Sequence, residues 1–258
     1  MKRIGVLLAM SLAIGGCVSN PSAEQASQDG AAAPAQPLAD RLTMFSGGPA
    51  GGLPQGWQPM VIFKQKKRTD YSLVAEQERT VLRALSANAS SGLMQHVSIE
   101  PREQPLLRWQ WKIGSLGERI VQAQELMEDA PARIILGFDG DKGELSFSEQ
   151  IQFETAKLIT GHDFPYATLM YEWHGNEPAG TIRQNKRSSR IRSVVVQSGT
   201  DAIGKWREFE RNIVEDFEHA YGEKPGRLIG VGILTDSDYT GETVEAWYGD
   251  IRLLSQNR

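Results

Sequence analysis

The residues whose types and spacing could do chemistry are carboxylates near the C-terminal end of the chain. An apolar run at 229–235 leads into Asp236 and Asp238, and Asp250 lies further along. Carboxylate oxygens are ligands that Ca²⁺ prefers, and carbonyl oxygens could complete a shell of six or more. A plain turn is the alternative, because Asp and Ser side chains bond their own backbone and Gly241 tolerates a positive φ. If strands 228–235 and 243–254 pair as a hairpin, Asp236, Asp238 and Asp250 meet in a Ca²⁺-type site of structural use, at the edge of a ligand cleft.

The same segment has the pattern D-x-D-x-T, from Asp236 to Thr240. It resembles the first motif of haloacid-dehalogenase-type phosphatases, where the first aspartate is the nucleophile. Only residues 241–258 follow, and they contain no lysine, although that family needs a lysine and acidic metal ligands later in the chain. The phosphatase reading is therefore disfavoured.

Aromatic and charged residues at predicted strand ends suggest a second kind of site. An exposed aromatic ring can stack on a sugar face, and we consider Trp173, Tyr239 and Trp247 for this role, although burial in the core is the more common location of such rings. The candidate ligand-binding set is completed by the polar residues His174, Arg133 and Arg211.

A basic run stands out against the acidic background of the chain. It consists of Arg183, Lys186, Arg187, Arg190 and Arg192. These side chains could meet a phosphate or an anionic glycan. More often such a run forms a solvated loop that leads into an edge strand and keeps it from aggregating.

The elements that must position these residues are predominantly strands. Residues 107–113 alternate apolar and polar, so Trp109 and Trp111 should face a core and Gln110 should face water. Further strands are expected at 58–63, 72–76, 81–86, 93–99, 133–138, 167–173, 193–197, 228–235 and 243–254. Ten short strands over about 215 residues favour a sandwich or barrel.

Two short helices are expected among the strands. Phe209, Ile213, Phe217 and Tyr221 recur every four residues before Gly222, which is typical of a helix stop. A weaker stripe runs from Phe147 to Leu158. Strands and helices do not alternate along the chain, which argues against a parallel sheet.

Composition excludes several classes of protein. The 258 residues carry a net charge of −4 and a pI near 5.7, which disfavours a nucleic-acid-binding protein. A single cysteine excludes an internal disulfide and a cysteine-rich zinc site. The oligomeric state does not follow from these numbers.

The first residues of the chain resemble a targeting signal. Lys2 and Arg3 precede an apolar stretch at 4–14, which is shorter than the roughly 20 residues of a spanning helix and fits a secretory signal peptide. The sequence Ile14-Gly15-Gly16-Cys17 resembles a bacterial lipobox, so we expect residues 1–16 to be removed and Cys17 to be acylated. Val18 follows instead of Asp, which favours a palmitate-bearing lipoprotein on the periplasmic face of the outer membrane. Residues 17–40 read as a flexible tether and 41–258 as one domain.

Motifs spread over residues 44–254 resemble the bacterial family called domain of unknown function 3047. They include Trp109-Gln110-Trp111-Lys112, Asp129-Ala130-Pro131-Ala132-Arg133, Tyr171-Glu172-Trp173 and Tyr248-Gly249-Asp250-Ile251. The resemblance implies membership of this family, but it does not imply a particular activity, because the family has no established one. The final strand is similar to those of galactose-binding-like jelly rolls, and the expected fold is an antiparallel β-sandwich of jelly-roll type with two short helices.

These observations together favour a binding module on a membrane-anchored envelope lipoprotein, with a glycan or another envelope ligand. One alternative is a hydrolase on the same sandwich, with Asp129, Arg133, His174 or Asp236 near its centre. The other is a structural or assembly partner of envelope proteins. A closed acidic pocket with a perturbed carboxylate would favour the hydrolase, and a flat apolar patch would favour the assembly partner.

Overall fold

The protein is described by a computed structural model that covers residues 38–61, 63–122 and 129–256. The chain divides after Pro37, and the second unit, Leu38–Arg258, contains everything described below. The expected signal peptide, Cys17 and most of the tether lie outside the described residues. Ala39, at the end of the expected tether, forms a bridge with Val97 and packs against the core. No helix among the described residues is long and apolar enough to cross a membrane.

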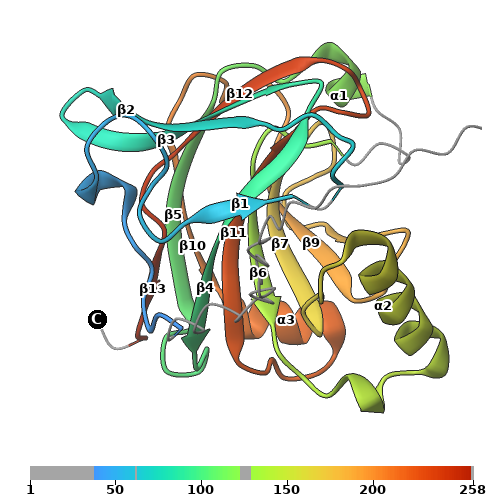
Figure 1. The fold of residues 1–258 in the computed structure, drawn as a ribbon. Helices are drawn as coiled ribbons and strands as arrows, with labels where there is room; N and C mark the ends of the chain where they lie inside the picture. The colour runs from blue at the N-terminus through green and yellow to red at the C-terminus, as the bar shows by residue number, and fades with distance from the viewer. Residues whose placement is uncertain (1–37, 62, 123–128, 257–258) are drawn as a thin grey trace, which may run out of the picture. The chain divides into compact units, whose positions relative to one another are not determined.

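Two β-sheets face each other and confirm the predicted sandwich (Figure 1). The first sheet has seven strands in the order β1-β4-β11-β6-β7-β9-β8. Its strands are β1 (Gln58–Met60), β4 (Ser90–Ile99), β6 (Arg133–Phe138), β7 (Ala167–His174), β8 (Ile182–Gln184), β9 (Ile191–Ser198) and β11 (Leu228–Asp236). All neighbours are antiparallel except β7 and β9, which run parallel.

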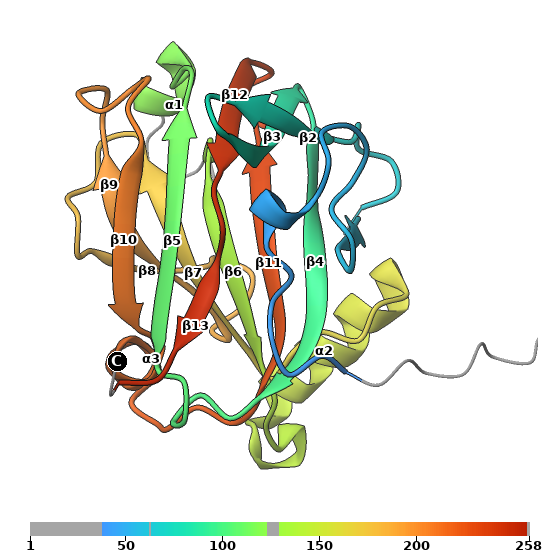
Figure 2. The ribbon, with the colours of Figure 1, turned by 90° about the vertical axis from the view of Figure 1, so that its left-hand side faces the viewer.

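The second sheet has six strands, ordered β10-β5-β12-β3-β2, with β13 also paired to β5. Its strands are β2 (Asp70–Glu76), β3 (Arg79–Ala87), β5 (Leu106–Ile113), β10 (Arg207–Asn212), β12 (Thr243–Tyr248) and β13 (Arg252–Leu254). Figure 2 shows β10, β5 and β13 in front of the strands of the first sheet.

The core fills the space between the sheets, and β5 supplies its largest side chains. Trp109 and Trp111 are 1% and 0% exposed, which confirms the inward face predicted for residues 107–113. Trp109 stacks on Tyr171 of β7 with ring centroids 5.0 Å apart, so the two sheets are joined by aromatic contact.

The described residues contain three α-helices, where two were expected: α1 (Glu118–Gln122), α2 (Phe147–Thr160) and α3 (Ile213–Tyr221). Gly222 ends α3 at φ 72°, as predicted. Phe209, however, belongs to strand β10 and not to the helix. The spacing of four residues predicted that Phe209 belongs to the helix. The helix begins only after Asn212, however, because Asn212 caps α3 by accepting hydrogen bonds from the amides of Val214 and Glu215.

The expected hairpin of 228–235 with 243–254 is wrong. Strand β11 pairs with β4 and β6, whereas β12 pairs with β3 and β5 in the other sheet. The connection between β11 and β12 therefore crosses from one sheet to the other. Ser237 holds it there, because its hydroxyl lies 2.9 Å from that of Ser86 on β3 and donates to the carbonyl of Glu242 at 2.8 Å.

Candidate functional site

A cleft of about 750 Å³ opens on the outer face of the seven-stranded sheet. Strand alternation builds its floor. In β6, Ile134 and Leu136 point into the core, so Arg133, Ile135 and Gly137 face the cleft. In β7 the same alternation turns Thr168, Met170 and Glu172 outward. The volume lies within the range of small-molecule sites, about 300–1,000 Å³.

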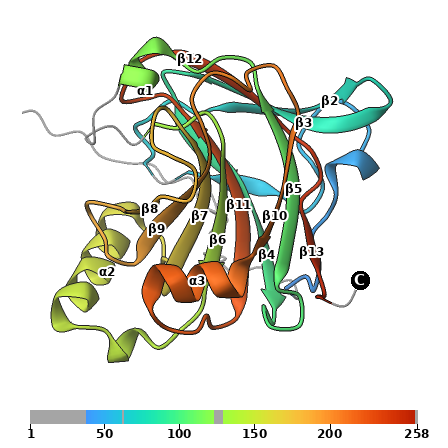
Figure 3. The ribbon, with the colours of Figure 1, turned by 180° about the vertical axis from the view of Figure 1, so that it is seen from behind.

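The walls come from the edge strands β1 and β8 and from loops beside the sheet. The segments that line the cleft together with Tyr239 include residues 58–61 with Phe63 and Lys66, residues 139–142, residues 162–166 and residues 183–187. The second and third of these segments flank α2, which stands on the side of the seven-stranded sheet that faces away from β5 and β10 (Figures 1 and 3). The centre of the floor is apolar and includes Met94, Ile135, Met170 and Leu234.

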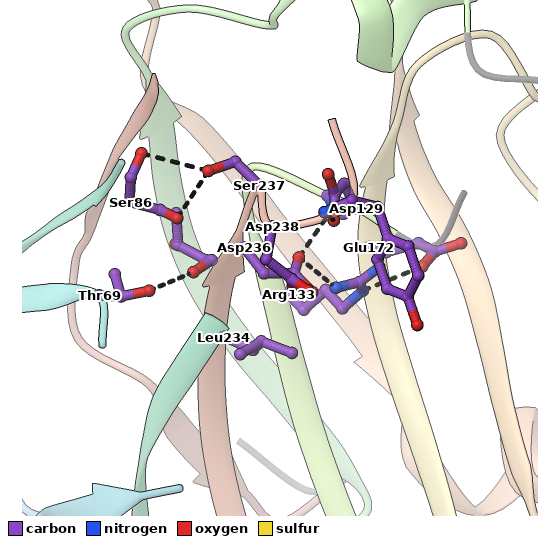
Figure 4. Close-up of polar contacts among 12 residues, drawn as sticks. Thr69, Ser86, Asp129, Arg133, Glu172, Leu234, Asp236, Ser237 and Asp238 are labelled. Carbon is purple, nitrogen blue, oxygen red and sulfur yellow. Dashed lines mark hydrogen bonds and ion pairs between the residues drawn. The ribbon is translucent and has the colours of Figure 1, made fainter. Parts of the chain in front are cut away.

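One end of the floor carries a buried network of charges (Figure 4). Arg133 Nη1 donates to Asp236 Oδ1 at 2.6 Å, and Arg133 Nε donates to Glu172 Oε2 at 3.3 Å. Arg183 Nη1 donates to the other Glu172 oxygen at 2.9 Å. The side chains of Arg133 and Glu172 are 5% and 2% exposed, so these bonds act where water screens them little.

Burial and neighbouring charges shift the pKa values of this network in opposite directions. Burial raises the pKa of Asp236 to about 6, although the adjacent Arg133 guanidinium opposes the shift. Burial also disfavours the charged form of Glu172, but Arg133 and Arg183 outweigh it and lower its pKa. For Arg133, burial is outweighed by Asp236 and Glu172, and its pKa rises. The network therefore combines one carboxyl group with a raised pKa of about 6 and one with a lowered pKa.

Three aspartates meet beside this network. Asp129, Asp236 and Asp238 each offer a carboxylate oxygen, and these oxygens lie within 4.8 Å of one another, so the group could hold a metal ion. Asp129 precedes β6 and accepts hydrogen bonds from the amide and hydroxyl of Thr240, both at 2.8 Å. Asp238 pairs with Lys66 through Oδ2, while its Oδ1 is buried and has no hydrogen-bond partner among the described residues.

Asp250 does not join this group, contrary to the expected metal set. It accepts hydrogen bonds from the amide and hydroxyl of Ser46 at 2.9 and 2.7 Å and pairs with Arg252. Because β12 lies in the other sheet, the chain carries Asp250 away from Asp236 after the crossing at Ser237. Asp129 supplies the third carboxylate of the group instead.

The candidate aromatic residues have three different locations. Trp173 is fully buried between the sheets, and its Nε1 donates to the Gly199 carbonyl at 3.0 Å, so its ring cannot stack on a ligand. Trp247 lies on the outward face of β12 in the six-stranded sheet, with Lys112 Nζ 4.4 Å from its ring centre. Tyr239 lines the cleft and is 41% exposed.

His174 and Arg211 do not line the cleft. His174 ends β7 and accepts hydrogen bonds through Nδ1 from the amides of Asn176 and Glu177, which is a turn. Burial lowers its pKa, which favours this neutral, accepting form. Arg211 pairs with Asp216 at the start of α3. Of the candidate ligand-binding residues, Arg133 and Tyr239 therefore reach the cleft.

The residues that sequence reasoning missed are Glu172, Lys66 and the methionines of the floor. Glu172 occupies an outward position in β7, whose inward positions are apolar. This alternation could have predicted from the sequence that Glu172 faces outward. Lys66 lies in a loop and approaches Asp238 only through the fold, so no sequence pattern indicates it.

Comparisons with known proteins agree with the family resemblance. A family model described as "Protein of unknown function (DUF3047)" matches residues 55–252, which is most of the chain. A search of curated proteins found no match.

Among solved structures, the chain is similar to the family 30 carbohydrate-binding module of a cellulosomal cellulase of Clostridium thermocellum. That match has 10% identity and a TM-score of 0.35, and it covers 86% of this chain and 96% of that one. A β-1,2-glucanase from Parabacteroides distasonis matches with 12% identity and a TM-score of 0.38, over 86% of this chain and 26% of that one. Cellulose induced protein, Cip1, matches with 12% identity and a TM-score of 0.28, over 78% of this chain and 92% of that one.

Proposed function

The chain belongs to the DUF3047 family, and we propose that it is a binding protein whose cleft on the seven-stranded sheet takes a saccharide of the cell envelope. One observation carries the proposal: an open cleft of about 750 Å³ combines an apolar floor with charged groups fixed at one end. Saccharides present the same combination, because their C–H faces are apolar and their edges carry hydroxyl groups.

The apolar part of the floor suits the C–H face of a sugar ring. Met94 on β4, Ile135 on β6 and Met170 on β7 lie in one row across the sheet, with only Gly232 of β11 between the first two, and Tyr239 adds an exposed aromatic ring at the rim. Methionine side chains adapt to irregular shapes, and aromatic rings pair with C–H groups.

The polar end suits sugar hydroxyls. Arg133, Glu172 and Asp236 hold one another in place, and Glu172 also holds Arg183, whose side chain is 20% exposed and lines the cleft, so a hydroxyl meets a donor that needs no rearrangement. Pre-organisation of this kind lowers the entropy cost of binding. The hydrolase alternative has the carboxyl group with a perturbed pKa that it requires, Asp236, but the cleft is open and Asp236 is paired with Arg133 and 9% exposed, so binding is the function we propose.

The test is binding of the purified full-length protein to a panel of immobilised glycans, followed by titration of the strongest ligand. Tyr239→Ala should weaken binding about tenfold, which corresponds to about 1.4 kcal/mol. Trp247→Ala is the matched control, since that ring lies on the other sheet, and it should leave the affinity unchanged. Equal losses in both variants, or a panel without a ligand, would overturn the proposal.

The location of the cleft is part of the proposal. A lipid-anchored chain beginning at Cys17, on a tether of some twenty residues, would hold the domain about 25 Å from the bilayer. Two or three acyl chains would anchor the protein stably, and Val18 in place of Asp after the cysteine favours the periplasmic face of the outer membrane, where envelope glycans are present.

A Ca²⁺ ion at Asp129, Asp236 and Asp238 is a second candidate, and the buried Asp238 Oδ1 without a partner favours it. An ion that binds the folded state alone raises the melting temperature with concentration. We expect millimolar Ca²⁺ to raise the melting temperature of the full chain and EDTA to reverse the shift. Asp238→Asn should abolish the response, and Asp250→Asn should keep it. No response of the wild type to either treatment would leave the aspartates as turn residues.

A further inference from the structure

The basic run at 183–192 is divided by the fold into residues with partners and residues that face the cleft. Arg183 pairs with Glu172, and Arg190 pairs with Glu223 at 2.5 Å. Arg192 donates to the carbonyls of Ala220 and Ser189. Lys186 and Arg187 line the cleft, are exposed, and have no carboxylate partner among the described residues.

The carboxylates of the cleft are almost all neutralised already. Glu172, Asp236, Asp238 and Asp163 each pair with an arginine or lysine. Within the described part of the cleft lining, Asp139 is the carboxylate that lacks such a partner, and it accepts a hydrogen bond from the Gly140 amide. In a chain with a net charge of −4, two adjacent unpaired cations at a cleft are an excess that a ligand can satisfy.

Arg187 is held in position before any ligand arrives. Its amide donates to Asn185 Oδ1 at 2.9 Å, and its Nη2 donates to the Tyr239 hydroxyl at 2.7 Å. The guanidinium keeps further N–H groups that can bind a carboxylate or phosphate in two-pronged fashion. Lys66, which pairs with Asp238, lies 4.7 Å from the Tyr239 ring centre and helps to hold that ring at the rim.

We propose that the saccharide taken by the cleft is acidic, and that Lys186 and Arg187 bind its anionic group while the ring lies against Tyr239 and the apolar floor. This inference rests on the proposed function and specifies its ligand. The shared chemistry is an anion on a sugar ring, carried as a carboxylate or as a phosphate ester.

The experiment compares acidic saccharides with uncharged saccharides that have the same sugar backbone. The full-length protein is titrated calorimetrically with trigalacturonate and with its methyl ester, which keeps the backbone and removes the charge. Trehalose 6-phosphate, with trehalose as its neutral form, is the phosphate arm. The variant Lys186→Glu/Arg187→Glu is compared with Lys224→Glu, an exposed lysine outside the cleft.

We expect at least one acid to bind, its neutral form to bind about tenfold or more weakly, and the affinity to fall with added salt. The double reversal should remove this preference, and Lys224→Glu should retain it. Binding of trigalacturonate would identify the anionic group as a carboxylate, and binding of trehalose 6-phosphate would identify it as a phosphate ester. If the neutral forms bind as well as the acids, or the double reversal changes nothing, the inference is wrong and the saccharide cleft stands. If neither form binds and the glycan panel is also negative, both proposals fail together.

Discussion

Arg133 and Asp236 form a buried ion pair between neighbouring strands β6 and β11, with Nη1 and Oδ1 2.6 Å apart and side chains 5% and 9% exposed. The pair closes one end of the cleft and joins it to Glu172 and the aspartate group. A charge at this depth is tolerated only with its partners, so the pair fixes the shape of the site.

Loss of Arg133 should strongly destabilise the fold. Arg133→Met leaves Glu172 and Asp236 as buried carboxylates without this cation, and the free energy of unfolding should fall by about 3–5 kcal/mol in urea titrations. The control is Arg108→Met, which breaks an exposed pair with Glu210 and should cost at most about 1 kcal/mol. Similar losses in the two variants would contradict the buried network.

Asp236 should make stability depend on pH. Its folded-state pKa of about 6 lies above the ordinary value of 3.8, so its contribution to stability is complete below pH 4 and is lost as the pH rises through 6. Relative to Asp236→Asn, the wild type should therefore lose up to about 3 kcal/mol between pH 4 and pH 7. Unfolding curves of both proteins at these pH values measure the difference. A constant difference would show that Asp236 titrates normally.

The two core tryptophans should matter more than the residue between them. Trp109→Ala and Trp111→Ala should each cost about 3–5 kcal/mol, because each removes a fully buried ring. Gln110 lies on the outward face of β5, where it bonds Arg79 and Glu208, and Gln110→Ala should cost little. If Gln110→Ala lowered the free energy of unfolding as much as either tryptophan substitution, the assignment of the inward and outward faces of β5 would be wrong.

Alternation made the strands and their inward faces predictable. Residues 133–138 were expected and observed as a strand with identical bounds. The same reasoning could have placed Trp173 in the core, since it shares parity with Leu169 and Tyr171 in β7. The short strands β8 and β10 were missed because β8 spans only 182–184 and β10 carries mainly charged residues.

Pairing between distant segments was not predictable from periodicity. Asp129 joins Asp236 because β6 pairs with β11, which no local pattern encodes. Asp250 was assigned to the site on the assumption of a hairpin, and the crossing of the chain at Ser237 removes it. The candidate site was thus predictable at Arg133, Asp236, Asp238 and Tyr239, which lie at strand ends or just beyond them.

The anchor is a prediction from the sequence. Cys17→Ser should abolish labelling with radioactive palmitate and move the protein from the membrane fraction to the soluble periplasmic fraction, or leave an uncleaved precursor. Val18→Ala is the control, because it leaves the cysteine and the small residues before it intact. Unchanged fractionation of Cys17→Ser, with no label in the wild type, would contradict acylation.

The most direct test of the saccharide cleft is a crystal structure of the full-length protein with the oligosaccharide that binds best. The account predicts density across the outer face of the seven-stranded sheet, over Met170 and beside Tyr239, with an anionic group at Lys186 and Arg187. Density on the six-stranded sheet beside Trp247, with this cleft free of sugar, would contradict it.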